Sequence, residues 1–359
     1  MVVKDNISWV DSARGISILL IVLFHIVGQV FTPEYYMGGF LKTFRIVTYE
    51  GVDVFFFLSG FGLSLSLLRR KQVNWGNWLR ARFIRIVPLY WFVLFVFFIA
   101  FLLKAPLNIT PTDHYLLDFL LHFSFLHTLN PATFFSINLA WWFLPIILMC
   151  YFFLILTWKI LVYFNFSASS QRRKISISIL AVILTIIAVS NIVYGFTNPG
   201  IINGVIFFYL GVFSSVFFVY EEKYFQKIFA NRYLLILSLL VVITGLLFLF
   251  QNSDNFLVSL FLVIFICSLS SIASDFQTSR LILKKISMLS YPMYLIHWAF
   301  IMPIFHANRH FPMITIPYYL VFIFSFIVYF FVVIIISYLL FLIDNKIFQF
   351  RNKTSLPVL

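Results

Sequence analysis

The sequence predicts an all-α, polytopic integral membrane protein. Hydrophobic residues make up 62% of the 359 residues, and charged residues make up only 10%. The apolar residues gather in stretches near twenty residues long, which is the length that an α-helix needs to cross the hydrocarbon core of a bilayer. Basic residues concentrate in every second connection between these stretches, as expected for helices that cross a membrane in alternating directions.

Ten stretches are predicted to be transmembrane helices. They cover residues 14–31, 53–68, 84–103, 139–161, 175–194, 200–219, 232–250, 255–273, 288–305 and 316–343. The second is short, so it tilts little or is broken, whereas the tenth is long enough to tilt or to protrude from the membrane. We expect a single membrane domain over residues 1–359, with no fused soluble domain outside the cytoplasm.

One connection, residues 104–138, is much longer than the others. Its three prolines, Pro106, Pro111 and Pro131, flank an apolar segment at residues 115–127. This segment is too short to span a bilayer, so we expect it to lie in the interface or to re-enter the membrane.

Lysine and arginine are distributed unevenly between alternate loops. If the N-terminus is cytoplasmic, 21 of the 25 Lys and Arg residues lie on the cytoplasmic side, and the outer loops hold four cations against six acids. The positive-inside rule therefore predicts a multi-pass protein of the cell (plasma or inner) membrane with both termini in the cytoplasm. The net charge of +13 follows from this topology and from contact with anionic lipids, so nucleic acid is not an expected partner.

The first predicted helix carries two ionisable residues, Arg14 and His25. Such residues inside a bilayer are candidates for function. Eleven positions separate them, which places them on one helix face about 16 Å apart along the axis. The alternative for His25 is a histidine that only hydrogen-bonds neighbouring helices. We favour function, because Arg14 is aligned with His25, cations gather on the side of Arg14, and few other ionisable groups are buried. An imidazole can act as general base to a hydroxyl or carry an acyl group itself, and both options suit acyl transfer.

A basic cluster follows the second predicted helix. Arg82 and Arg85 are three positions apart at the start of the third helix, shortly before Pro88, and so share one face. Their forked guanidinium groups are suited to bind phosphate. The other cations of the cluster, at residues 69–71 and Arg80, are interpreted as an orientation signal with lipid contacts.

The second predicted helix offers two further polar candidates, Asp53 and Ser59. Asp53 is either an exposed acid at the outer interface or a site residue, and Ser59 is either a packing residue or a site residue. Gly60 and Gly62 permit close approach of a neighbouring helix.

Four other ionisable side chains are interpreted as structural. His122 and His127, with Asp118 nearby in the sequence, resemble a metal-ligand set only weakly, so no metal is expected. His297, in the ninth predicted helix, is interpreted as a histidine of a helix interface.

Four segments, in this order, resemble the bacterial membrane acyltransferase family three, which contains the polysaccharide O-acetylases. They are Ser12-Ala-Arg-Gly-Ile with His25, Gly51-Val-Asp-Val-Phe-Phe-Phe-Leu-Ser-Gly-Phe, Arg82-Phe-Ile-Arg-Ile-Val-Pro-Leu-Tyr, and Leu289-Ser-Tyr-Pro-Met-Tyr-Leu-Ile-His. The resemblance runs from Trp9 to about the tenth helix. It implies a ten-helix core, acyl-CoA (acetyl-CoA in the simplest case) donated from the cytoplasm, and sugar hydroxyls of cell-surface or lipid-linked glycans as acceptors.

The resemblance also assigns residues. Arg14 and His25 match the family's arginine that stands ten residues before a histidine, and Arg82 and Arg85 match its paired arginines. The candidate acceptor or support residues, at positions that are frequent in the family but of less defined role, are Asp11, Asp53 and Ser59. Many relatives carry a glutamate after the start of the fourth helix, but the run that begins at Asn138 has no acid, so a glutamate-assisted step is not expected.

These matches define a mechanistic hypothesis. The phosphates of acyl-CoA rest on Arg14, Arg82 and Arg85, and the pantetheine arm lies along the first helix. The thioester arrives near His25, which either deprotonates an acceptor hydroxyl or takes the acyl group as a transient acyl-imidazole. No permanently bound cofactor is expected. The expected partners are acyl-CoA, a surface glycan or lipid-linked saccharide, membrane lipids and glycan-assembly proteins.

Three other functions remain open. An exporter or flippase of lipid-linked sugar would use the same aromatic-rich bundle, with its 49 Phe and 18 Tyr, and would not turn over acyl-CoA. A relay subunit would only deliver acyl groups across the membrane to an external transferase. A sensory membrane module would need a signalling domain, which we do not expect.

Overall fold

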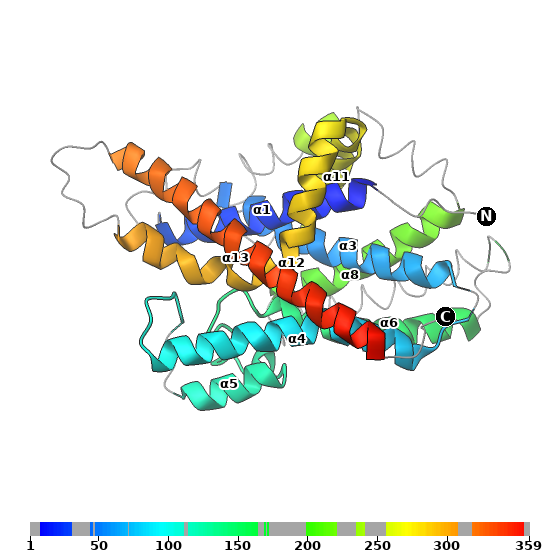
Figure 1. Cartoon of the computed structure of the whole chain (residues 1–359). Coiled ribbons are helices and arrows are strands. Elements are labelled where there is room, and N and C mark those ends of the chain that lie inside the picture. Colours follow the sequence, from blue (N-terminus) through cyan, green and yellow to red (C-terminus); the bar gives the residue numbers. More distant parts are fainter. Residues whose placement is uncertain are drawn as a thin grey trace. The chain divides into compact units, whose positions relative to one another are not determined.

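The structure is a computed structural model, shown in Figure 1. It describes residues 8–30, 44–45, 47–70, 72–110, 114–163, 169, 171, 199–220, 235–240, 256–307 and 318–354. Within these ranges all regular structure is helical, apart from one isolated bridge between Thr110 and Ile137. The predicted all-α class is therefore confirmed. The predicted helix 175–194, and most of 232–250, lie outside the described residues, although residues 235–240 are helical.

The helices follow the predicted order along the chain. They are α1 (Ser8–Val30), α3 (Gly51–Leu68), α4 (Trp75–Leu102), α5 (Tyr115–Phe123), the short 3₁₀ helix η1 (His127–Leu129), α6 (Phe143–Tyr163), α8 (Pro199–Tyr220), α11 (Phe256–Asp275), α12 (Gln277–Ala307) and α13 (Tyr318–Thr354).

Seven of the described helices are long and apolar enough to cross a membrane. They correspond to the predicted helices one to four, six, nine and ten, while α11 corresponds to the eighth. The number ten and the orientation of the termini stay predictions. The second helix is longer than its predicted stretch 53–68, because its apolar helical stretch extends back to Val47.

Helix α1 begins at Ser8, six residues before its predicted start, and two further helices begin earlier by a larger margin. α4 begins at Trp75 and α12 at Gln277, whereas the predicted starts are residues 84 and 288. Their first turns are polar or charged, so a search for apolar stretches misses them. Arg82 and Arg85 consequently lie two to three turns inside α4, and not at its start.

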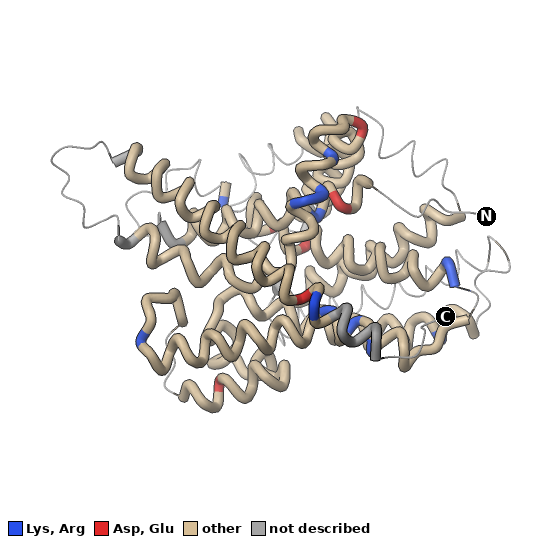
Figure 2. The backbone as a smooth tube through the Cα atoms, viewed as in Figure 1, with Lys and Arg blue, Asp and Glu red and all other residues tan. Residues whose placement is uncertain are grey.

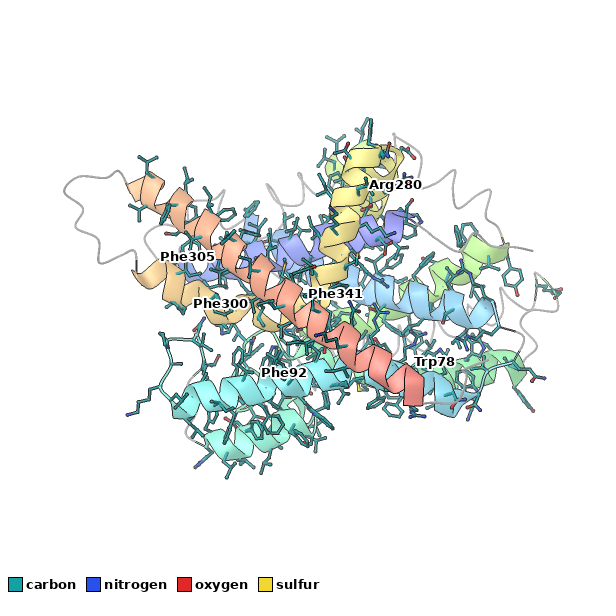
Figure 3. The ribbon with its side chains drawn as sticks, in the orientation of Figure 1. Trp78, Phe92, Arg280, Phe300, Phe305 and Phe341 are labelled. Carbon is teal, nitrogen blue, oxygen red and sulfur yellow. The ribbon has the colours of Figure 1, made fainter. Side chains whose placement is uncertain are left out.

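The exposed surface of these helices is suited to lipid. Large apolar side chains are exposed along α13, among them Phe324 at 63% and Phe331 at 65%, and Phe92 of α4 is 41% exposed. Figure 3 shows Phe92 and other side chains standing out from their helices, and Figure 2 shows long helical stretches without charge. Such apolar surface indicates contact with a bilayer, so the chain is a membrane protein.

The chain forms two compact units. The first unit contains Met1–Ser17, Glu50–Trp75 and Ile146–Arg280, and the second unit contains Ile18–Tyr49, Gly76–Pro145 and Leu281–Leu359. Helix α1 contributes its first part to the first unit and its second part to the second unit.

The first unit is built on close packing of α3 against α8. A Cβ atom at Gly60 would collide with the backbone of Phe208, and one at Gly211 would collide with the backbone of Phe57. Gly204 likewise faces the ring of Phe56, 2.4 Å from the place where a Cβ would be. The prediction that Gly60 allows close helix approach is therefore confirmed.

In the second unit, α5 packs antiparallel against the end of α4 (Figure 1). The rings of Phe101 and Tyr115 stack with centroids 3.5 Å apart, and those of Trp91 and Phe123 stack at 4.4 Å. The apolar segment of the long connection, which forms α5, therefore packs along the surface of α4.

Left-handed residues end both α4 and α5. Lys104 has φ 51° and Phe125 has φ 60°, and each follows its helix at the position that favours glycine. The Ala105 amide bonds to the Ala100 carbonyl and the Leu126 amide to the Leu121 carbonyl, which is the Schellman pattern. These two caps end α4 and α5.

Backbone carbonyls of α12 anchor the long connection. The Trp141 indole donates a 3.0 Å hydrogen bond to the Leu295 carbonyl, the Asn138 amide lies 3.5 Å from the same oxygen, and the Tyr294 hydroxyl donates to the Ala140 carbonyl. The run that begins at Asn138 is therefore a turn docked on α12, and the helix that follows it begins only at Phe143.

Proline creates a further anchor on α12. Pro303 has no N–H, so the carbonyl of Ala299 four residues earlier lacks its helical donor. The backbone N–H of Asn108 donates to that carbonyl at 2.9 Å. The long connection thus binds α12 on either side of residue 297.

Candidate functional site

His25 lies on α1 in the second unit, with 8% of its surface exposed. Its ring contacts two neighbouring residues of α12. The His297 ring centroid is 5.0 Å away, and the Trp298 ring meets His25 edge-on at 5.3 Å. The sequence predicts a structural role for His297 and does not predict its contact with His25. The sequence signal for a functional role of His297 is its position at the end of the Leu289–His297 segment.

The surroundings of His297 fix its neutral tautomer. Its Nδ1 lies 2.8 Å from the Tyr294 carbonyl and 3.2 Å from the Met293 carbonyl. Carbonyl oxygens only accept hydrogen bonds, so Nδ1 must carry the proton and Nε2 must carry the lone pair. The Nε2 atom is buried and has no hydrogen-bond partner among the residues that the structure describes.

A cation stands close to His25 in the same unit. The Arg45 guanidinium lies over the Phe24 ring at 5.3 Å and 3.2 Å from the position of a Cβ at Gly28. Its charge acts on His25, and burial lowers the pKa of Arg45 itself. The sequence predicts Arg45 only as one of the four cations of the outer loops.

The predicted phosphate-binding arginines lie on α4, also in the second unit. Arg82 is half-buried, with its guanidinium 5.4 Å from the ring of Trp78, which Figure 3 labels. Arg85 is exposed and interacts electrostatically with Asp344 of α13. The pair therefore presents one stacked and one exposed guanidinium.

Helix α12 connects the arginine pair to the histidine pair. The Tyr291 hydroxyl donates a 2.5 Å hydrogen bond to the carbonyl of Ile86, the residue after Arg85. His297 lies six residues after Tyr291, or about 9 Å along the helix axis. Within the second unit, His25 and the α4 arginines thus share α12 as a neighbour.

The remaining predicted site residues lie in the first unit. Arg14 is half-buried, and its guanidinium packs against α3 at Gly62, 3.5 Å from the position of a Cβ. Asp11 and Ser59 are half-buried, but Asp53 is only 4% exposed, so it is not an exposed interface acid. The grouping of Arg14 with Arg82 and Arg85 stays a prediction.

A buried acid of the first unit was not predicted from the sequence. Glu50, counted with the outer loop acids, is 1% exposed and accepts a hydrogen bond from the Ser259 hydroxyl of α11. No pattern around Ser259 pointed to this contact. The Glu50 carboxylate, directly before α3, is therefore held inside the first unit.

His122 and His127 form a second imidazole pair, beside α4. Their rings stack with centroids 3.7 Å apart; His122 Nδ1 lies 3.1 Å from the Tyr90 hydroxyl, and Nε2 lies 3.2 Å from that of Ser136. Burial, followed by the neighbouring His127, lowers the pKa of His122, and burial lowers the pKa of His127 to about 3. Across the described part of the chain, no cluster of three or more potential ligands could hold a metal ion.

The segments that carry this geometry match a known family. A family model described as an acyltransferase domain, of acyltransferase family three, matches residues 7–342. The chain belongs to this family. It is therefore a membrane acyltransferase, and its match includes both histidine pairs and both α4 arginines. Neither the curated proteins nor the solved structures gave a match to this acyltransferase.

Proposed function

We propose that this acyltransferase moves an acyl group, acetyl in the simplest case, from cytoplasmic acyl-CoA to a hydroxyl of a cell-surface polysaccharide or lipid-linked glycan. One observation carries the proposal. A buried imidazole, His25, lies on a membrane-spanning helix of an acyltransferase beside a second imidazole whose tautomer is fixed.

The chemistry requires a base inside the protein. A sugar hydroxyl is a poor nucleophile until its proton is removed, and a neutral imidazole is suited to remove it. His25 takes the hydroxyl proton, the oxygen attacks the thioester carbonyl, and the carbon–sulfur bond breaks. CoA leaves as the thiol with that proton. In the alternative route His25 itself attacks the thioester, and the acyl-imidazole then passes the acyl group to the hydroxyl.

The arginines of α4 are the proposed donor site. Arg85 offers an exposed guanidinium and Arg82 a stacked one, and forked guanidinium groups bind phosphate oxygens in pairs. Under the predicted orientation both face the cytoplasmic side, where acyl-CoA is available. We assign Arg14 to the same donor, and Asp11, Asp53 and Ser59 as candidate support residues, from the sequence alone.

The rival functions differ in what happens to acyl-CoA. A lipid-linked sugar exporter does not turn over acyl-CoA, and an Arg82→Ala change would hardly affect it. A relay subunit releases CoA but needs a separate transferase before any glycan is acylated. Family membership favours transfer over export.

The test is mass spectrometry of surface glycans from cells that contain the chain, lack it, or carry His25→Ala. We expect one acyl mass increment per modified sugar in the first cells only. The matched control is His114→Ala, because His114 is an exposed histidine whose side chain does not cap α5. Undiminished acylation with His25→Ala would overturn the proposal.

A further inference from the structure

One unexplained feature of the second unit is the unoccupied acceptor of His297, which lies next to the proposed base His25. The residue is fully buried, its Nδ1–H is engaged by the Tyr294 carbonyl, and its Nε2 has no hydrogen-bond partner among the described residues. A buried acceptor without a donor costs free energy, and the membrane interior supplies no water to relieve it. Such an atom in a native protein needs an explanation, and a role in catalysis is one.

Hydrogen bonds from neighbouring elements fix the position of His297 on α12. The Tyr329 hydroxyl of α13 donates a 2.9 Å hydrogen bond to the His297 carbonyl, and the Trp141 indole holds the Leu295 carbonyl two residues earlier. With the bond from Nδ1 to Tyr294, three contacts hold this part of α12 and its ring. A fixed ring is suited to orient another group.

His25 is a neighbouring side chain that can supply the missing donor. Its ring centroid lies 5.0 Å from that of His297, which is close enough for a modest ring rotation to bring two nitrogens within hydrogen-bonding distance. Trp298 packs edge-on against His25 from the next position of α12 and limits the directions in which the ring can turn.

We propose that His297 is a positioning residue for His25. Its Nε2 lone pair accepts a hydrogen bond from one ring N–H of His25, which leaves the other His25 nitrogen with its lone pair directed to the substrate. This inference rests on the proposed function, because it assigns the orientation of the same base. A pair of neutral imidazoles thus does what a carboxylate and an imidazole do in other acyl-transfer sites.

The proton balance of the step is unchanged by His297. His25 takes the proton of the acceptor hydroxyl on its free nitrogen, and becomes a cation whose other N–H is still bonded to His297 Nε2. The same proton passes to the departing sulfur of CoA. His297 remains neutral throughout, so its contribution is orientation and stabilisation of the charged His25 in the transition state.

Two substitutions separate this role from packing. His297→Asn keeps a donor near the Nδ1 position but removes the acceptor at Nε2, whereas His297→Gln places an amide near Nε2. The full chain, purified in lipid nanodiscs, is assayed with acetyl-CoA and glycan extracted from cells that lack the chain, by release of free CoA. We expect kcat of His297→Asn to fall about 100-fold with an unchanged KM for acetyl-CoA, and His297→Gln to stay within about tenfold of the unmodified protein.

A matched control and a second measurement complete the test. His127→Phe exchanges another buried histidine of the same unit and should leave kcat within about twofold. Modification of His25 by diethyl pyrocarbonate, followed by mass spectrometry, needs no substrate turnover. We expect slower modification in His297→Asn than in His297→Gln, because an oriented imidazole is the better nucleophile.

Equal kcat values and equal modification rates for the Asn and Gln variants would overturn the positioning role. If His25→Ala is inactive in that case, the proposed function stands and only the inference fails. If the unmodified chain releases no CoA, the proposed function fails and the inference falls with it.

Discussion

Each of the two units of this acyltransferase is stabilised internally by a different kind of contact. In the first unit the backbones of α3 and α8 touch through glycines, and Gly60 leaves no room for even a methyl group. In the second unit, side chains such as Trp141 and Tyr329 reach backbone carbonyls of α12. Every described histidine also belongs to the second unit. The first unit therefore gains stability from close contact, and the second contains the described histidines, including His25 and His297.

The difference between the two units indicates where a membrane protein has space for polar functional side chains. Backbone contact through glycines leaves little space for functional side chains. Long donors such as indole and phenol keep helices further apart and leave polar groups between them, each of which needs a partner. His25 and His297 occupy that second kind of environment.

The largest expected effect is in the first unit. Gly60→Ala places a methyl group into the Phe208 backbone and forces α3 away from α8. We expect a loss of about 3 kcal/mol in the free energy of unfolding. The matched control is Gly62→Ala, whose methyl group would meet the Arg14 guanidinium at an ordinary 3.5 Å. Thermal unfolding in detergent measures both, and equal melting temperatures would contradict the close-packing account.

The second expected effect is acid sensitivity confined to the second unit. The pKa of buried His127 is about 3, while an exposed histidine titrates near 6.5. Between these values the unfolded chain binds more protons than the folded one, so stability is full above about pH 6.5 and falls as the pH drops toward 3. From pH 7 to pH 5 the loss from His127 is about 2 kcal/mol.

Thermal unfolding of His127→Phe as a function of pH checks this effect. We expect a shallower fall in melting temperature below pH 6.5 than in the unmodified protein, with the remaining slope due in part to His122, whose pKa is lowered in the same direction. An unchanged slope would show that the acid sensitivity originates elsewhere.

The smallest expected effect concerns the anchor on α12. Trp141→Phe removes the indole donor from the Leu295 carbonyl and leaves most of the ring volume in place. We expect a loss of about 1 to 2 kcal/mol in stability. Because Leu295 lies two residues before His297, kcat should fall more than the stability change alone explains. Activity at a temperature well below the melting point measures this effect. An unchanged kcat would show that the hydrogen bond from Trp141 to Leu295 does not affect the site.

Much of the fold could be predicted because apolar length alone identifies a membrane helix. Helix starts were less accurate at α4 and α12, since Trp75 and Gln277 begin polar turns that carry no apolar signal. The path of α5 was also not predictable, because it depends on left-handed caps at Lys104 and Phe125, where the sequence has no glycine.

The candidate site could be predicted only in part. His25 was recognisable because an ionisable residue within an apolar stretch is conspicuous. The role of His297 depends on which nitrogen faces a carbonyl and on a ring 272 positions earlier in the chain, and neither follows from sequence spacing. The buried contact of Glu50 with Ser259 was missed for the same reason.

The central claim is that His25 is the base of acyl transfer from acyl-CoA. The most direct measurement supplies labelled acetyl-CoA to the purified chain in nanodiscs, together with glycan extracted from cells that lack it. The account predicts transfer of label to the glycan by the unmodified protein and a decrease of about 10³-fold for His25→Ala. Undiminished transfer by His25→Ala would contradict the account.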